Sequence, residues 1–433
     1  MNVLLVTHGS RGDVQPFLAL ASGLTAAGHT VTLMGPYTFV ELARSAGVPY
    51  VPVLDGPLEL YTDPVVRRAN EDRRGLRGIV RGVQWFRRNR PQYVKLLDDL
   101  TAKVKAQPRP DVVVFAPWLP VQHLAEWLKV PAVPVCFQPG WVPTPDFVNP
   151  LAPGRLPASL SRASYAHAEL PVRLLYGSAL ARVRCESLGL SDRGNKLSIL
   201  SRPDGGPATV LQAFDPGVLP GTPRYPPTTH TTGFWHLPTT GDWRMPADLR
   251  AFLDAGERPV YIGFGSMAGS RAAAKSRAVL AAVRQAGVRA VIATGWGGVR
   301  APDGEQGRDV DKVFFMDEVP HEEVFPHMAA IVHHGGAGTT ASALRSGRPQ
   351  VVCPFTFDQP FWARRMHALG LAPPPLPQYR LTAGRLAASL DRAVNDRELA
   401  EAAEQFALRT VTRNGVEKAV EVIETVVESR VHC

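Results

Sequence analysis

A glycine-rich segment, with two histidines before it and two threonines at its end, carries the strongest chemical signal in the chain. It reads His333-His334-Gly335-Gly336-Ala337-Gly338-Thr339-Thr340, between an apolar run at 329–332 and helix-compatible residues that reach 346. Glycines let a phosphate group approach the backbone closely, and a helix N-terminus offers unpaired N–H groups and the positive end of its dipole. His334 and the threonine hydroxyls add donors, so we interpret the segment as a diphosphate site rather than a plain turn.

Two other nucleotide-binding motifs are excluded by the residues present. A dinucleotide site of the Rossmann type needs GxGxxG after the first strand and an acidic residue at the end of the second. Here the first turn reads HGSRGDVQP and the second strand ends in TLMGP. The GxxxxGK[ST] pattern of a P-loop is also absent.

Short apolar runs alternate with amphipathic stretches in both halves of the chain, and these elements must position the glycine-rich segment. The first run, at 3–7, precedes a helical pattern at about 14–27 that Gly28 ends. The further strands that we expect lie at 30–34, 50–53, 111–115, 132–136, 259–264, 290–293, 312–315, 329–333 and 350–353. Alternating strands and helices predict an α/β fold whose parallel sheets are covered on both faces.

A stretch rich in Pro, Gly and Thr, at 203–246, interrupts this alternation. We therefore predict two doubly wound, Rossmann-like domains at 1–215 and 246–405, a linker at 216–245 and a helical tail at 406–433. Open α/β sheets bind ligands at the carboxyl ends of their strands. Two such domains facing a cleft can bring two substrates together.

Composition limits the other classes of protein. The chain has 433 residues, 45% of them hydrophobic, and four scattered cysteines without a CxxC pair, which suggests neither zinc nor disulfides. It has no apolar run of the ~20 residues that span a bilayer and no basic leader, so we expect a cytoplasmic protein. The net charge of +9 favours anionic partners, but no recognised nucleic-acid module accompanies it.

Several motifs in the same order resemble those of one enzyme family. The glycine-rich segment and 349–360, PQVVCPFTFDQP, resemble the donor signature of family 1 glycosyltransferases with the GT-B fold. Residues 9–16, GSRGDVQP, are similar to the bacterial natural-product and sterol glucosyltransferase branch, and 263–267 and 318–321 extend the resemblance over both domains.

This resemblance implies an N-terminal acceptor domain, a C-terminal donor domain and a last helix that returns to the first domain. The implied reaction is inverting transfer of a hexose from a UDP- or dTDP-sugar to a hydroxyl of a largely apolar small molecule. No Asp-x-Asp metal motif is evident, so neither a metal nor another cofactor is expected, and the sugar nucleotide is a co-substrate.

The donor residues that the resemblance implies surround a nucleoside diphosphate sugar. Gly265 and Ser266 face the phosphates, Asp358 and Gln359 hydrogen-bond the sugar, and the backbone of Val319 reads the base. Other expected contacts come from Arg11, Gly12, Trp296 and the glycine-rich segment. Glu318 and Ser342 stand where plant members carry a tryptophan and a ribose-binding glutamate, so UDP and dTDP both stay open.

The implied catalytic residues are Asp13, as the base that takes the acceptor's proton, and His334, which assists the leaving diphosphate. Asp is also a favoured helix N-cap, and both roles can hold for Asp13. We expect the acceptor to meet His8, Phe137 and Trp141.

Arginines and apolar residues interleave at 67–90. This segment is either a basic amphipathic helix that contacts an anionic membrane or a bulky anionic acceptor, or a solvated face over a hydrophobic acceptor pocket. The alternatives left open are a sterol or lipid glucosyltransferase at a membrane surface, a nucleotide-sugar epimerase and a non-catalytic binding protein.

Overall fold

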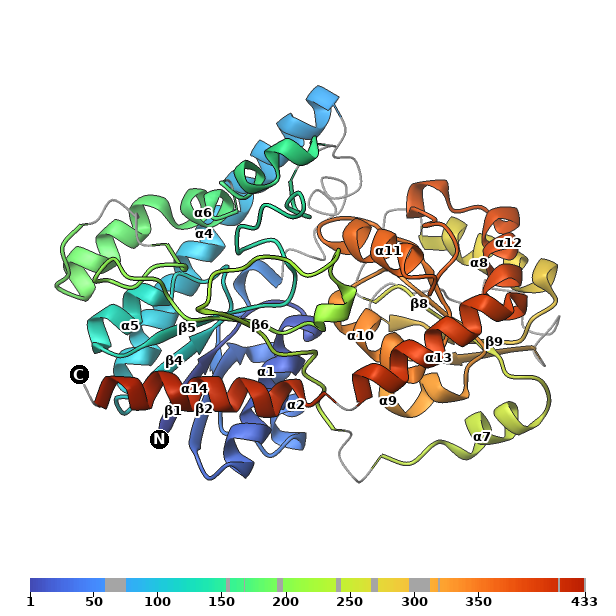
Figure 1. Ribbon diagram of the computed structural model, residues 1–433, viewed down its shortest axis with the longest axis horizontal. Helices are drawn as coiled ribbons and strands as arrows, with labels where there is room; N and C mark the ends of the chain where they lie inside the picture. Colours follow the sequence, from blue (N-terminus) through green and yellow to red (C-terminus); the bar gives the residue numbers. More distant parts are fainter. Residues whose placement is uncertain are drawn as a thin grey trace. The chain divides into compact units, whose positions relative to one another are not determined.

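The computed structural model describes the chain except for 59–74, 153–155, 167, 193–197, 239–242, 266–271, 296–311, 318–319, 412 and 432–433. Two compact units result (Figure 1). Unit 1 comprises Met1–Pro238 and Asn414–Cys433, and unit 2 comprises Thr239–Arg413. The chain therefore passes from one unit to the other twice.

Unit 1 is built on a parallel sheet with the strand order β3-β2-β1-β4-β5-β6-β7. Its strands are β1 (Asn2–Val6), β2 (Thr30–Pro36), β3 (Tyr50–Val53), β4 (Val112–Phe115), β5 (Ala132–Cys136), β6 (Val210–Gln212) and β7 (Thr229–Thr231). Central strands such as β1 and β4 read as continuous apolar runs because helices cover both faces of the sheet. The order reverses between β1 and β4, which is the point where open α/β sheets bind ligands.

The helices of unit 1 cover this sheet. They are α1 (Arg11–Ala26), α2 (Val40–Ser45), α4 (Gly75–Ala106), α5 (Gln122–Leu128), α6 (Leu170–Arg182) and α14 (Gly415–Val431), with short turns η1 (Tyr37–Phe39), η3 (Ala158–Leu160), η4 (Arg162–Tyr165), η5 (Val183–Ser187) and η6 (Pro216–Val218). Helix α1 begins three residues before the start that the apolar pattern predicts, because Ser10 and not Asp13 is its N-cap.

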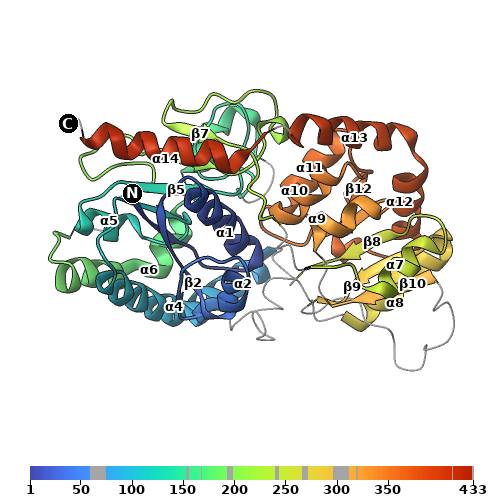
Figure 2. The same ribbon diagram turned by 90° about the horizontal axis from the view of Figure 1, so that it is seen from below.

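The last helix, α14, packs along α1 within unit 1 (Figures 1 and 2). A Cβ atom added to Gly23 of α1 would lie 2.2 Å from Cγ1 of Val416, so the two helices approach closely at this glycine. His29 Nε2 and Glu424 Oε1 form a further link over 2.8 Å. Residues at the end of the chain thus complete the unit that the first residues begin.

Unit 2 is built on a second parallel sheet, ordered β10-β9-β8-β11-β12. Its strands are β8 (Val260–Gly263), β9 (Ala290–Ala293), β10 (Val313–Met316), β11 (Ile331–His333) and β12 (Gln350–Val352). The helices are α7 (Ala247–Asp254), α8 (Ala272–Ala286), α9 (His321–Val324), α10 (Ala337–Ser346), α11 (Gln359–Ala368), α12 (Ala383–Asn395) and α13 (Arg397–Val411), with turns η9 (Phe325–His327) and η10 (Gln378–Arg380).

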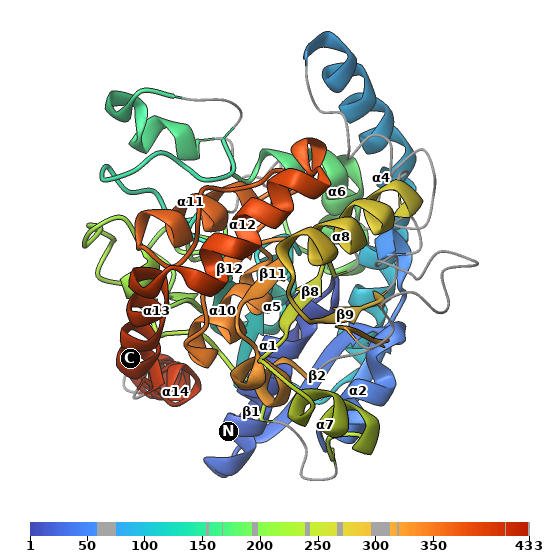
Figure 3. The ribbon, with the colours of Figure 1, turned by 90° about the vertical axis from the view of Figure 1, so that its right-hand side faces the viewer.

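Successive side chains of a strand point to opposite faces of its sheet, so alternate residues of the unit 2 strands pack into two different hydrophobic cores. Val260 and Ile262 of β8 join the core beneath α8 and α12, which lie side by side (Figure 3). Tyr261 packs on the other face with Phe325 and Met328.

The described units differ in their bounds from the segments that composition suggests. The stretch at 216–245, expected to be a linker, contains η6 and the edge strand β7, and unit 1 extends to Pro238. Strand β7 reads Thr229-His230-Thr231, which has no apolar run to indicate a strand. Helix α13 stays in unit 2 to Val411, so the tail that belongs to unit 1 starts at Asn414 rather than at 406.

Candidate active site

The glycine-rich segment forms the turn between β11 and α10. Gly336 is the N-cap of α10, and its carbonyl accepts the N–H of Thr340 over 2.9 Å. The first N–H groups of a helix, here those of Ala337 and Gly338, have no partner within the helix and carry the positive end of its dipole. This helix end can therefore bind an anion.

The ring of His334 lies beside this helix end. A Cβ atom on Gly265 would lie 2.9 Å from its Cε1, and one on Gly336 would lie 2.5 Å from its Nε2, so the ring is packed between two backbone segments. Burial lowers the pKa of His334 to about 4, which leaves the ring neutral at pH 7. Its Nδ1 is buried and has no hydrogen-bond partner in the part of the chain that the structure describes. The ring thus retains hydrogen-bonding capacity next to the first turn of α10.

Gly335 has a different environment from the other glycines of the segment. Its N–H donates to Nδ1 of His333 over 3.1 Å, inside the protein. The donors that we assign to a ligand are therefore those of the first turn of α10.

The second donor motif lies against the first because β11 and β12 are neighbours in the sheet. A Cβ atom on Gly335 would lie 3.2 Å from the carbonyl oxygen of Gln359. The side-chain Oε1 of Gln359 accepts the N–H groups of Phe355 and Thr356 over 2.8 and 3.1 Å, so this buried glutamine shapes the loop before α11.

Asp358 is the N-cap of α11, and its Oδ2 accepts the indole N–H of Trp362 over 2.8 Å. Burial raises the pKa of Asp358 to about 6. A carboxylate in this position can accept hydrogen bonds from sugar hydroxyls once it is ionised.

Glu322 of α9 is a residue of this region that the sequence motifs do not single out. Ser342 Oγ of α10 donates to its Oε1 over 2.9 Å, and Arg345 Nε lies 3.5 Å from its Oε2. The carboxylate of Glu322, from the neighbouring helix α9, therefore lies beside Ser342, the position at which plant members carry a glutamate. The expected donor residues Ser266, Trp296 and Val319 lie outside the described residues.

Asp13 lies at the first turn of α1, after the central strand β1. Its Oδ2 accepts both the N–H of Ser10, over 2.7 Å, and the hydroxyl of Ser10, over 2.9 Å. This is the reciprocal pairing of a helix N-cap with the third residue of the helix. Gly12 and Arg11 are exposed beside it, and Arg11 Nε donates to Gln15 Oε1 over 3.2 Å.

The residues expected to meet the acceptor are more buried than their motifs suggest. His8 is 4% exposed, its Nε2 bonds the carbonyl of Leu54 over 3.0 Å, and burial lowers its pKa to about 4. Phe137 is 6% exposed and packs edge-on against Phe17 with ring centroids 5.8 Å apart. Trp141 is 7% exposed. These side chains lie under the surface at the carboxyl end of the sheet.

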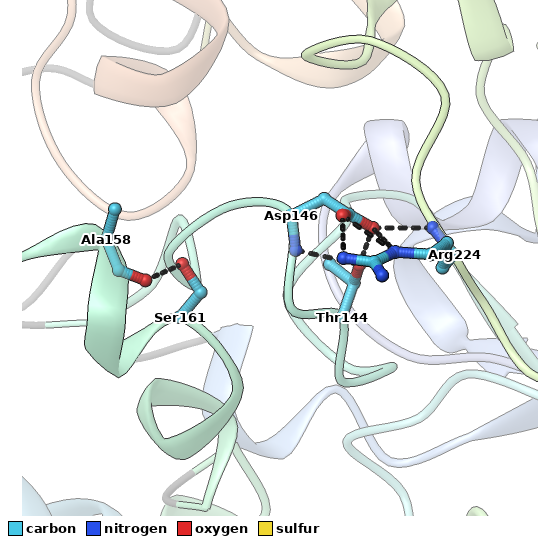
Figure 4. Close-up of polar contacts among 5 residues, drawn as sticks. All are labelled: Thr144, Asp146, Ala158, Ser161 and Arg224. Carbon is cyan, nitrogen blue, oxygen red and sulfur yellow. Dashed lines mark hydrogen bonds and ion pairs between the residues drawn. The ribbon is translucent and has the colours of Figure 1, made fainter.

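An ion pair holds the loop that follows β5 (Figure 4). The guanidinium of Arg224 donates from Nη2 and Nε to Asp146 Oδ1 over 2.7 and 3.0 Å, and its backbone N–H donates to Oδ2 over 2.7 Å. Thr144 Oγ1 adds a bond to Oδ2 over 2.9 Å. These hydrogen bonds from Arg224 lower the pKa of Asp146 to about 2.

Solved structures share this architecture. A glycosyltransferase of kitacinnamycin matches with a TM-score of 0.69 and 21% identity, covering 98% of this chain and 99% of that chain. The glycosyltransferase VinC, solved in complex with dTDP, matches with a TM-score of 0.65 and 22% identity over 99% of this chain and 100% of that one.

Sequence comparisons identify the family. The "Glycosyltransferase family 28 N-terminal domain" matches residues 3–97, and the "Erythromycin biosynthesis protein CIII-like, C-terminal domain" matches 302–428. The O-mycaminosyltylonolide 6-deoxyallosyltransferase of Streptomyces fradiae is 34% identical over 439 residues, which cover 99% of this chain and 98% of that protein. The chain belongs to the GT-B glycosyltransferases.

This glycosyltransferase is also similar to longer proteins. A sterol 3-beta-glucosyltransferase of Arabidopsis thaliana is 30% identical over 97% of this chain, but the match spans only 64% of that protein. Among the described residues of the glycosyltransferase, no three His, Cys, Asp or Glu side chains could hold a metal ion together. None of its described helices is long and apolar enough to cross a membrane.

Proposed function

We propose that this protein is an inverting glycosyltransferase that moves a hexose from a UDP- or dTDP-sugar to a hydroxyl of a largely apolar small molecule. The observation that carries the proposal is the placement of the His334 ring beside the N-terminus of α10, with a buried Nδ1 that has no hydrogen-bond partner among the described residues. An anion site of this kind suits a diphosphate. Asp358, on the neighbouring loop, suits the hydroxyls of the attached sugar.

The transfer requires one bond to form and one to break. The acceptor oxygen attacks the anomeric carbon while Asp13 takes the hydroxyl proton. The bond from that carbon to the diphosphate oxygen breaks, and its electron pair leaves with the nucleoside diphosphate. The N–H groups of α10 and the neutral His334 stabilise the charge that develops on this leaving group. A single displacement inverts the anomeric centre and assigns no role to a metal.

The relatives support an acceptor class. The Streptomyces relative is named for a tylonolide acceptor and matches over nearly its whole length, whereas the sterol glucosyltransferase matches over 64% of its length. We therefore infer a natural-product aglycone as the acceptor.

A sterol or lipid acceptor at a membrane surface is the second candidate. It is favoured by Arg87 and Arg88, which are exposed on α4 beside the half-buried rings of Trp85 and Phe86, which meet edge to face with centroids 5.2 Å apart. Residues 67–74 of the basic segment lie outside the described residues. Cosedimentation with anionic vesicles at rising salt decides this point, because electrostatic membrane binding weakens as salt rises.

A thermal-shift series with UDP, dTDP, GDP and NAD tests the donor site. We expect UDP or dTDP to stabilise the wild type, and we expect the shift to disappear in His334→Ala. His327→Ala, at an exposed position of unit 2, is the matched control and should retain the shift. A response to NAD alone, or an undiminished response of His334→Ala, would contradict the proposal.

A further inference from the structure

His333 ends β11 and is buried between two neighbouring strands. Its backbone pairs with Val352 of β12 and with Gly263 of β8, and the residue is 0% exposed. The proposed transfer uses the adjacent His334 but gives His333 no role, although a buried imidazole is costly unless both of its nitrogens are satisfied.

A backbone amide sets the direction of hydrogen bonding through the His333 ring. The N–H of Gly335 donates to Nδ1 over 3.1 Å, and an amide N–H can only donate, so Nδ1 carries no proton. In a neutral ring the proton is then on Nε2, which donates to Gln350 Oε1 over 2.9 Å. The Gln350 amide nitrogen lies 3.6 Å from the sulfur of Met366 on α11. A chain of polar contacts therefore runs from the Gly335 N–H through His333 and Gln350 to Met366 of α11.

The ring remains neutral in this environment. Burial, followed by the proximity of His334, lowers the pKa of His333 to about 3. A second proton would have to sit on Nδ1, where it would face the N–H of Gly335. The hydrogen bond and the neutral state therefore support each other.

Gly335 is the residue of the turn that most needs an external support. Its φ is +87°, and a Cβ atom would lie 2.9 Å from Cγ1 of Val352, so only glycine fits. Glycine also has the greatest backbone freedom in the absence of other contacts. The next residue, Gly336, is the N-cap of α10, so the orientation of the Gly335 peptide determines where that helix end points.

We infer that His333 is a positioning residue, whose Nδ1 holds the Gly335 peptide so that the first N–H groups of α10 and the ring of His334 face the diphosphate. The identity of the ligand rests on the proposed function. The hydrogen bond between His333 and Gly335 does not depend on it.

Two variants separate this role from plain packing. The side-chain oxygen of Asn in His333→Asn occupies about the position of Nδ1, so it still accepts the N–H of Gly335. The longer amide in His333→Gln reaches toward Gln350 and leaves Gly335 without its acceptor. Both variants lose part of the imidazole's packing, so both should lower the thermal midpoint of unfolding to a similar extent.

Calorimetric titration with UDP and with dTDP measures the consequence. We expect His333→Gln to weaken binding of the preferred nucleotide by roughly tenfold, the scale of one lost hydrogen bond, and His333→Asn to stay within about threefold of the wild type. Equal weakening in the two variants would overturn the inference.

The tautomer of His333 supplies a readout that needs no ligand. Long-range 15N–1H NMR correlations of the wild type at pH 7 should show the proton on Nε2 and a bare Nδ1. A proton on Nδ1 would overturn the inference whatever the titrations show. If the wild type binds neither nucleotide, the proposed function fails, while the tautomer still decides whether His333 holds Gly335.

Discussion

Trp362 donates its indole N–H to Asp358 Oδ2 across the first turn of α11. This hydrogen bond stabilises the charged form of the Asp358 carboxylate, whereas burial destabilises it and has the larger effect. Burial raises the pKa of Asp358 to about 6 in the folded protein, whereas an unfolded aspartate has a pKa of ~3.9. The folded state therefore binds this proton more tightly than the unfolded state does.

Stability should consequently depend on pH through Asp358. Its contribution is fully present below about pH 4 and is lost as the pH rises through about 6. Urea denaturation at several pH values should show that the free energy of unfolding of the wild type falls by on the order of 1–3 kcal/mol over this range because of Asp358, and that Asp358→Asn lacks this loss. Asp254→Asn, at an exposed position of unit 2, should keep the wild-type dependence. Parallel pH curves for wild type and Asp358→Asn would refute the assignment.

Asp13 should prove essential for turnover but not for donor binding. Replacing the proposed base by Asn should lower kcat by about 10²–10⁴, while the dissociation constant of the nucleotide stays the same. Steady-state kinetics and calorimetry measure the two quantities. Ser10→Ala is the control for helix capping, because it removes one of the two bonds to Asp13 and leaves the carboxylate in place. A loss of kcat in Ser10→Ala as large as in Asp13→Asn would mean that Asp13 acts only through the helix.

Gly23 and Val416 should reveal how closely α1 and α14 pack. Alanine normally stabilises a helix over glycine by up to about 1 kcal/mol. Here the added Cβ would lie 2.2 Å from Val416 Cγ1, so Gly23→Ala should instead destabilise by about 1–3 kcal/mol. The double variant Gly23→Ala/Val416→Ala should recover most of this loss in urea denaturation. A stabilised single variant would show that the two helices are not in contact at this position.

The ion pair between Asp146 and Arg224 should order the loop after β5. Arg224→Gln removes the two-pronged guanidinium contact, so amide hydrogen exchange across 138–149 should become several times faster. Arg202→Gln, which breaks an exposed ion pair with Asp204, should leave that segment unchanged. Under the proposed function, Arg224→Gln should also raise KM for the acceptor and not for the donor. Unchanged exchange would mean that the loop is held by its buried residues alone.

Much of the fold was predictable because buried parallel strands have a simple signature. Strands β4 and β8, and β1 after Asn2, are continuous buried runs, since both of their faces are covered. Strand β7 could not be predicted in this way, because an edge strand of three polar residues resembles the Pro- and Gly-rich loop around it. The start of α1 was missed because the cap, Ser10, precedes the apolar pattern by four residues.

The candidate site was predictable where its residues lie in one motif. Glycines and histidines next to a strand indicate the proposed anion site at 333–340. The partners of those residues are harder to predict, because they come from other elements. Glu322 reaches Ser342 from another helix, and Arg224 reaches Asp146 over 78 positions of sequence. From sequence alone, a charged residue in a loop is expected to be solvated, because its ion-pair partner can be identified only once the fold is known.

The order in which the ribosome makes this chain differs from the order in which its units are completed. Ala419, Val420 and Ile423 of α14 belong to the core of unit 1, yet they are synthesised after all of unit 2. Translation proceeds at about 5–20 residues per second, so α14 is synthesised on the order of tens of seconds after the surface of α1 around Gly23, against which it packs. Unit 2 is continuous in sequence and can finish first. During translation, unit 1 is thus the first unit to begin and the last to have its core completed.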